Sequence, residues 1–287
     1  MNAQAKKYAL SAQKTEITEY HIYKKLARRT RSEKNAQVLN KIAEQEKQHA
    51  AFWESKTGVK VKPDKWRLYR TYFMARFLGL AFALKLMESR EGTGAENYSR
   101  QAKYFPEAAE FAKEEGEHER AILKMLEGGN LTFVGSVVLG LNDALVELTG
   151  ALAGFTLALG ETKVISLAGL VTGISAALSM AASEYLSTKA EGDARAKESA
   201  LYTGVAYLGT VILLILPFFL VNNKFLALGI VLVTALLIIY GFNFYVAVVK
   251  ELNFKKRFFE MAAISMGVAA FSFLVGFALK SLLGVDV

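Results

Sequence analysis

Two motifs of the same pattern organise this chain: Glu46-Lys47-Gln48-His49 and Glu115-Gly116-Glu117-His118. The chain has three histidines, and two of them lie three positions after a glutamate. Both motifs fall in segments with helical periodicity, where residues i and i+3 project from one face. Each motif can therefore direct a carboxylate and an imidazole toward one point.

Two further glutamate pairs have the same spacing, Glu16 with Glu19 and Glu88 with Glu91. Along the chain the order is Glu-x-x-Glu, Glu-x-x-His, Glu-x-x-Glu, Glu-x-x-His, which is an internal repeat of a helical hairpin. A Glu-x-x-His motif from each of two helices, with a Glu from each of two others, forms dinuclear iron or manganese sites in four-helix bundles. The first 129 residues are therefore predicted to form a metal-binding bundle.

Local signals place the ends of the predicted helices. Ser32 can cap the second helix, Gly58 ends it, and Pro106 suits the first turn of the fourth. The four helices are predicted at about residues 2–30, 33–56, 66–90 and 106–127.

On these motifs, residues 1–129 resemble the ferritin-like, rubrerythrin-type di-iron domain. Carboxylates and imidazoles together suit Fe(II) or Mn(II). Rubrerythrins also carry a cysteine-ligated iron that supplies electrons, and this chain has no cysteine. The resemblance implies iron, or manganese, held by Glu16, Glu46, His49, Glu91, Glu115 and His118, with Glu19 and Glu88 as additional candidates.

Residues 130–287 contain long uncharged runs, and a membrane-spanning helix needs about 20 mostly apolar residues. Lysine and arginine residues are concentrated in the second and fourth connections between these runs. The positive-inside rule therefore predicts that both connections and the N-terminal domain are cytoplasmic. The C-terminus is then on the opposite side. The fold class is all-α, a cytoplasmic ferritin-like four-helix bundle followed by a five-helix transmembrane domain. The spans are predicted at about 132–159, 164–188, 200–221, 225–249 and 258–282.

Acidic residues lie inside these predicted spans, where charge is costly and usually functional. Asp143 and Glu147 are four positions apart on one face of the first span, and Glu184 lies near the cytoplasmic end of the second. Small residues in the first span permit close approach of other helices. These residues are Gly140, Gly150 and Gly154.

The second domain resembles the vacuolar iron transporter family, which includes the yeast-type Ca²⁺-sensitive cross-complementer proteins. The resemblance covers residues 131–282 and is carried by the strings 140–147, 150–154, Ser179-Met180 and Ser183-Glu184-Tyr185. It implies a dimer that exchanges Fe²⁺ or Mn²⁺ for protons, with Asp143 and Met180 lining the ion path. Glu147 and Glu184 are further candidates for that path.

Two positions depart from the plant-type pattern of this family. Eight residues before Met180, where those members carry a glutamate, this chain has Thr172. Their glutamate-rich module between the second and third spans is reduced here to about residues 189–198. The N-terminal domain is a plausible replacement, since it places a carboxylate-rich site on the same side of the membrane.

The expected function is export of Fe²⁺ or Mn²⁺ from the cytoplasm by proton antiport, in a homodimer in the plasma membrane of a prokaryote. The net charge of +8 does not indicate nucleic-acid binding, because no compact basic patch with aromatic residues accompanies it. One alternative is a membrane-tethered di-iron ferroxidase or peroxide scavenger. Another is a metal sensor that regulates the pore. Sequence also leaves open whether each bundle forms within one chain or by exchange of helices across the dimer.

Overall fold

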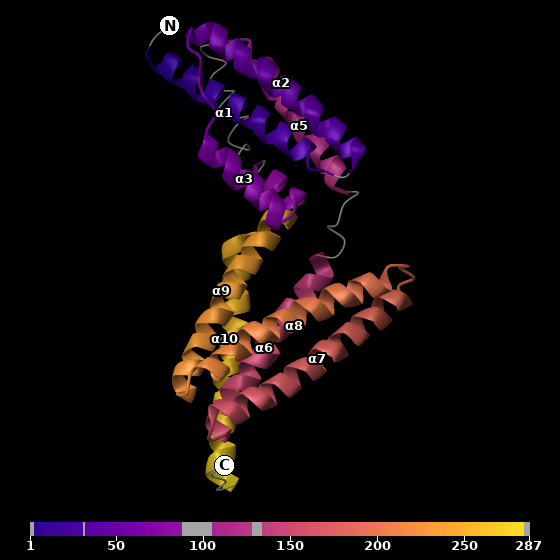
Figure 1. The fold of residues 1–287 in the computed structure, drawn as a ribbon, viewed down its shortest axis with the longest axis vertical. Coiled ribbons are helices and arrows are strands. Elements are labelled where there is room, and N and C mark those ends of the chain that lie inside the picture. Colours follow the sequence, from indigo (N-terminus) through magenta and orange to yellow (C-terminus); the bar gives the residue numbers. More distant parts are fainter. Residues whose placement is uncertain (1–2, 31, 88–104, 128–133, 284–287) are drawn as a thin grey trace. The chain divides into compact units, whose positions relative to one another are not determined.

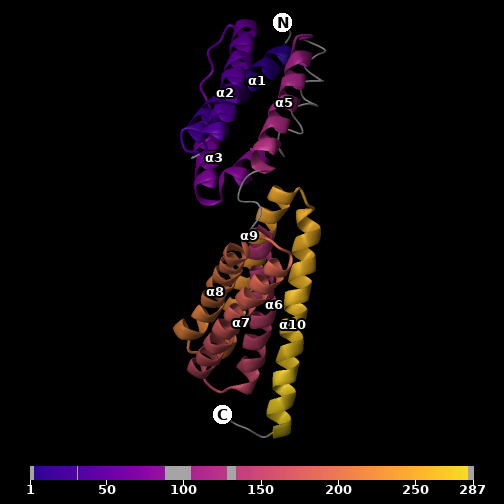
Figure 2. The same cartoon turned by 90° about the vertical axis from the view of Figure 1, so that its right-hand side faces the viewer.

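The computed structural model describes residues 3–30, 32–87, 105–127 and 134–283. Every regular element in these ranges is a helix (Figures 1 and 2). The chain divides into two compact units, Met1–Leu131 and Thr132–Val287, and each is described by itself.

In the first unit, α1 packs lengthwise against α2, α3 packs against α1, and α5 packs against α2 (Figure 1). Residues 80–87 are also helical. The helices with described bounds are α1 (Ala3–Ala27), α2 (Glu33–Thr57), α3 (Lys65–Phe77) and α5 (Ala108–Glu127).

Both predicted ends of α2 are confirmed. The side chain of Ser32 accepts a hydrogen bond from the backbone N–H of Asn35, which satisfies one of the free donors in the first turn. Gly58 has φ +66°, and its N–H donates to the carbonyl of Glu54. A left-handed residue at this position closes the helix, and glycine adopts it without a Cβ clash.

The prediction of one helix over residues 66–90 is wrong. α3 ends at Phe77, where the N–H of Leu78 donates to the carbonyl of Met74 at 2.8 Å. Gly79 follows with φ +94°, and the chain turns before helix resumes at residue 80. A glycine inside a helical pattern was the available signal for this break. The ferritin-like bundle stays a prediction, because residues 88–104 lie outside the described residues.

Two apolar clusters form the core of the first unit. One contains Ala9, Trp53 and Phe105, and the other contains Leu26 and Ile42. On α1, α2 and α5 alike, buried acidic or imidazole side chains lie between the residues of the first cluster and those of the second. The polar layer is therefore closed by apolar side chains at both ends.

In the second unit, five of the described helices are long and apolar enough to cross a membrane, which supports a multi-pass integral membrane protein. This confirms the predicted number of candidate spans. The last helix begins at Phe254, four residues before the predicted span, and the side chain of Asn253 accepts a hydrogen bond from the N–H of Lys256 in its first turn. The helices are α6 (Val134–Ala158), α7 (Thr162–Ala190), α8 (Ala196–Leu220), α9 (Lys224–Lys250) and α10 (Phe254–Leu283).

α6 contacts all four other helices of this unit, most extensively α10 and α8. The hydroxyl of Thr203 on α8 donates to the carbonyl of Ser136 at 3.1 Å, and that of Ser265 on α10 donates to the carbonyl of Leu145 at 2.6 Å. Gly140 permits the approach of α8, since a Cβ built there would lie 2.5 Å from the carbonyl oxygen of Thr203. Small residues and hydroxyls thus hold α6 at the centre of the unit.

We expect Gly140→Ala to destabilise the second unit by about 1–3 kcal/mol, because its methyl group must displace backbone of α8. Gly135→Ala on the same helix is the matched control, since nothing lies within 4 Å of its added Cβ. Loss of helix by circular dichroism during SDS titration in micelles measures the difference. Equal stability of both variants would show that the contact between α6 and α8 is not tight.

Candidate metal centre

Four buried or half-buried side chains from three helices converge in the first unit. One ligand atom of each lies within 4.8 Å of the corresponding atoms of all the others. His118 is adjacent, with its Nδ1 atom 3.2 Å from Oε1 of Glu46. The four residues are Glu16 of α1, Glu46 and His49 of α2, and Glu115 of α5.

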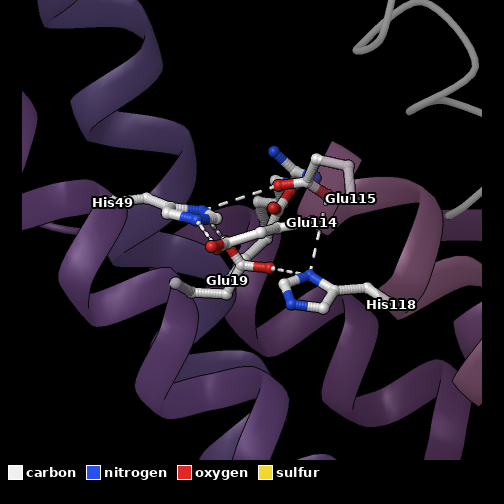
Figure 3. A network of polar contacts seen from close by, with 7 residues as sticks. Glu19, His49, Glu114, Glu115 and His118 are labelled. Carbon is white, nitrogen blue, oxygen red and sulfur yellow. Dashed lines mark hydrogen bonds and ion pairs between the residues drawn. The ribbon is translucent and has the colours of Figure 1, made fainter. Parts of the chain in front are cut away.

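Glu46 and Glu115 bring the two histidine motifs together. Within α2, Nδ1 of His49 lies 3.4 Å from Oε2 of Glu46, and within α5, Nδ1 of His118 lies 3.8 Å from Oε2 of Glu115. Across the helices, Nδ1 of His49 lies 3.7 Å from Oε1 of Glu115. The i, i+3 spacing and the packing of α5 on α2 together place both imidazoles around shared carboxylates (Figure 3).

These residues fit a divalent metal ion. Oε2 of Glu46, Nδ1 of His49 and both ring nitrogens of His118 are buried and have no hydrogen-bond partner among the described residues. Such atoms are costly to bury unless something satisfies them. A cation would do so, and a set of carboxylates with imidazoles suits borderline divalent ions such as Fe²⁺ and Mn²⁺.

Without a metal, protons supply the positive charge of the site. Burial opposes ionisation of Glu46, but its interactions with His118, His49 and Glu16 outweigh burial and lower its pKa to about 2. Burial also disfavours the charged form of His118, but Glu115 and Glu46 raise its pKa to about 10. Burial, followed by the charge of Glu46, raises the pKa of Glu16 well above its usual value. Metal binding therefore requires release of protons.

Glu114 contacts the other nitrogen of His49, at 2.7 Å between Oε2 and Nε2. The ring of Phe111 lies 4.3 Å from the same imidazole, centroid to centroid. A carboxylate on Nε2 holds the ring in place and leaves Nδ1 directed at the cluster, the usual support of a metal-binding histidine. No spacing in the sequence indicates this role for Glu114, because only the packing of α5 on α2 brings the two side chains together.

The remaining predicted ligands, Glu19, Glu88 and Glu91, are not among the residues that the described structure brings together at this site. Glu19 is buried and forms an ion pair with Arg67 of α3. Glu88 and Glu91 lie outside the described residues. The described part of the site therefore contains the two Glu-x-x-His motifs and Glu16, and the second Glu-x-x-Glu pair of the predicted repeat stays a prediction.

In the second unit, the predicted path residues lie on α6 and α7. Asp143 is half-buried, and Glu147 accepts a hydrogen bond from the hydroxyl of Tyr207 on α8 at 2.8 Å. Glu184 accepts one from the hydroxyl of Ser136 on α6 at 2.7 Å. Met180 is half-buried and packs against the apolar core.

We expect Glu114→Ala to weaken metal binding in the first unit by about 10- to 100-fold, because His49 loses the group that orients it. Glu117→Ala is the matched control, since Glu117 is three residues further along α5 and exposed. Titration of the full chain with Mn²⁺, followed by the paramagnetic resonance of free Mn²⁺, measures both. Equal affinities would exclude an orienting role of Glu114.

The metal-free first unit should be less stable at pH 9 than at pH 6. The stability from His118 is fully present below its unfolded pKa of about 6.5 and is lost as pH rises toward 10. Glu46 has a lowered pKa, so its contribution is present above about pH 4.5 and does not change between pH 6 and 9. Thermal unfolding of the chelator-treated chain, followed by tryptophan emission, reports on this unit because both tryptophans, Trp53 and Trp66, belong to it.

His118→Gln should reduce this pH dependence, and saturating Mn²⁺ should also reduce it because the ion replaces the protons. A metal-free wild-type chain with the same unfolding midpoint at both pH values would contradict the charge balance described for the site.

Comparison with known proteins adds one family. Residues 134–200 match the model of the VIT family. The matched stretch covers α6, α7 and the start of α8, and it includes Asp143, Glu147, Met180 and Glu184. No curated protein matches the chain. The match and the candidate spans around it support a VIT-family membrane protein, and this family implies membrane transport of iron or manganese.

Proposed function

We propose that this chain exports Fe²⁺ or Mn²⁺ from the cytoplasm in exchange for protons, and that its first unit binds the same metal in a dinuclear site on the cytoplasmic side. The match of residues 134–200 to the VIT family is the observation that carries the transport proposal. Five spans with acidic residues inside them exceed what an anchor requires, which favours transport over a tethered enzyme.

Asp143 and Glu147 are the central groups of the proposed path. They are one helical turn apart on α6, so both carboxylates lie along one side of that helix. Tyr207 holds Glu147 toward α8 by a hydrogen bond, while Asp143 has a half-buried side chain. Met180 adds a thioether, and borderline Fe²⁺ accepts sulfur better than Mg²⁺ or Ca²⁺ does.

Proton exchange follows from carboxylate chemistry. A deprotonated carboxylate attracts a divalent cation, and a protonated one does not, so ion and proton compete for the same oxygen atoms. A proton entering Asp143 or Glu147 from outside would release the ion there. A proton leaving to the cytoplasm would restore the binding site.

The proposed direction of transport, out of the cytoplasm, rests on the distribution of lysine and arginine residues. Lys189, Arg195 and Lys197 lie at the connection between α7 and α8, and Lys255 and Lys256 lie at the connection between α9 and α10. Both connections follow an even number of spans, so they share a side with the first unit. The positive-inside rule assigns that side to the cytoplasm.

The first unit suits metal capture rather than conduction. Its site joins Glu16, Glu46, His49, Glu115 and His118 in a buried layer between two apolar clusters. Two divalent ions would neutralise the carboxylates there, the arrangement found in helical-bundle dinuclear sites. Five spans enclose an ion path poorly on their own. A second copy of the chain, in a homodimer, would complete the walls of that path.

Uptake of Mn²⁺ or Fe²⁺ by everted membrane vesicles tests the transport proposal. We expect uptake that depends on a pH gradient and is abolished by Asp143→Asn, because the amide carries no charge for the ion and accepts no proton. Glu161→Gln is the matched control, an exposed acid at the start of α7 that we expect to leave uptake unchanged. Uptake without a pH gradient, or normal uptake by Asp143→Asn, would refute the exchange mechanism.

The same vesicles test the contribution of the first unit. Glu46→Ala removes the carboxylate that both histidines contact. We expect half-maximal uptake to require more metal, while uptake at saturating metal stays near the wild-type rate. Uptake identical to that of the wild type at every metal concentration would mean that the metal site of the first unit does not contribute to transport.

A further inference from the structure

Only some of the apolar residues of α3 lie on the side of the helix that points into the first unit. Thr71 and Ala75 are buried, and Leu68 packs against the apolar cluster around Leu26 and Ile42. These positions, i, i+3 and i+7, form one side of the helix, and this side contacts α1. The inner face is thus complete with small and aliphatic side chains.

The opposite side of α3 is aromatic and exposed. Its four rings are spaced i, i+3, i+7 and i+11, so they form one continuous stripe. A helix that is apolar on two opposite sides requires a partner on each. Adjacent exposed apolar side chains of this kind mark an interaction surface. This aromatic stripe consists of Trp66, Tyr69, Phe73 and Phe77, exposed by 76%, 49%, 54% and 75%.

The borders of the aromatic stripe are basic. α3 contains four basic residues and no acidic residue. Lys65 and Arg76 are exposed beside the stripe, and the guanidinium of Arg76 lies 5.7 Å from the ring centre of Phe77. From α1, the ammonium of Lys25 lies 4.5 Å from the ring centre of Tyr69. The partner of this surface therefore combines an apolar layer with negative charge.

We propose that α3 is an interfacial helix, whose aromatic stripe enters the headgroup region of the bilayer that the second unit spans. Tryptophan and tyrosine favour this region because their rings are amphipathic. Lysine and arginine at the borders pair with anionic headgroups. The inference rests on α3 and on the presence of spans in the same chain, and it holds whether or not the proposed transport is correct.

A second copy of the chain fits this surface less well. A two-fold interface places the same patch of both copies face to face. α3 would then meet α3, and the exposed basic residues beside each stripe, Lys65 and Arg76, would approach those of the other copy with no acidic residue on either helix. Like charges at such an interface oppose association. Lipid phosphates provide the opposite charge instead.

Trp66 is a reporter within the aromatic stripe itself. The chain has two tryptophans, and the other, Trp53, is fully buried in the core. The test uses the full chain in vesicles of phosphatidylcholine and phosphatidylglycerol, with and without bromine on the lipid acyl chains. We expect Trp66 in the Trp53→Phe chain to lose about half or more of its emission in brominated vesicles, because an interfacial ring reaches the acyl boundary. The Trp66→Phe chain should lose little.

If Trp53→Phe does not fold, the difference between wild type and Trp66→Phe measures the same quenching. Replacing Phe73 and Phe77 together by serine should remove it, since both rings are exposed and stack on each other. Val59→Ser is the matched control, an exposed apolar residue of the same unit outside α3. Arg76→Gln should lower the equilibrium constant for docking of the stripe on the bilayer about fivefold.

Acrylamide in the water phase separates the outcomes. Quenching of Trp66 by brominated lipid with protection from acrylamide supports docking on the bilayer. Quenching by acrylamide alone means that the stripe faces water and overturns the proposal. Protection from both quenchers means that protein covers the stripe, either a second copy or another segment of this chain, and this also overturns it.

Discussion

The carboxylate of Glu46 lies between two imidazole rings, with its oxygens 3.4 Å from Nδ1 of His49 and 3.2 Å from Nδ1 of His118. Buried carboxylates gathered this closely are unfavourable unless positive charge accompanies them. Protons on the histidines and on Glu16 meet that requirement without metal, and a cation meets it otherwise. Because these side chains come from α1, α2 and α5, the arrangement of the three helices depends on this balance of charge. Apolar clusters on both sides keep water from weakening it.

The two units place their acidic groups in different surroundings. The site of the first unit has at least five donors in a closed layer, which favours retention of an ion. The acidic residues of the second unit are spread along α6 and α7, and each of Glu147 and Glu184 has a hydroxyl partner on another helix. A path must bind an ion well enough to admit it and weakly enough to release it. This difference is consistent with the proposed division, in which the spans conduct the ion and the first unit captures it.

Packing in the second unit depends on small residues and hydroxyl groups. Apolar side chains give little drive for helices to associate within lipid, so close contact and hydrogen bonds decide which helices pair. Gly140 and Thr203 bring α8 against α6, and Ser265 bonds α10 to the carbonyl of Leu145. These contacts make α6, which carries Asp143, the helix that meets every other span of its unit.

Which side chains share a helix face is readable from the sequence, because the backbone of a single helix sets that spacing. The sequence placed Glu46 with His49 and Asp143 with Glu147, and its apolar runs predicted five spans. Which of these faces meet depends on how the helices pack against one another. The contact of Glu114 with His49 needs α5 beside α2, and the outward direction of the ring of Trp66 needs the other side of α3 to pack on α1. Such pairings join segments distant along the chain, and no local spacing encodes them.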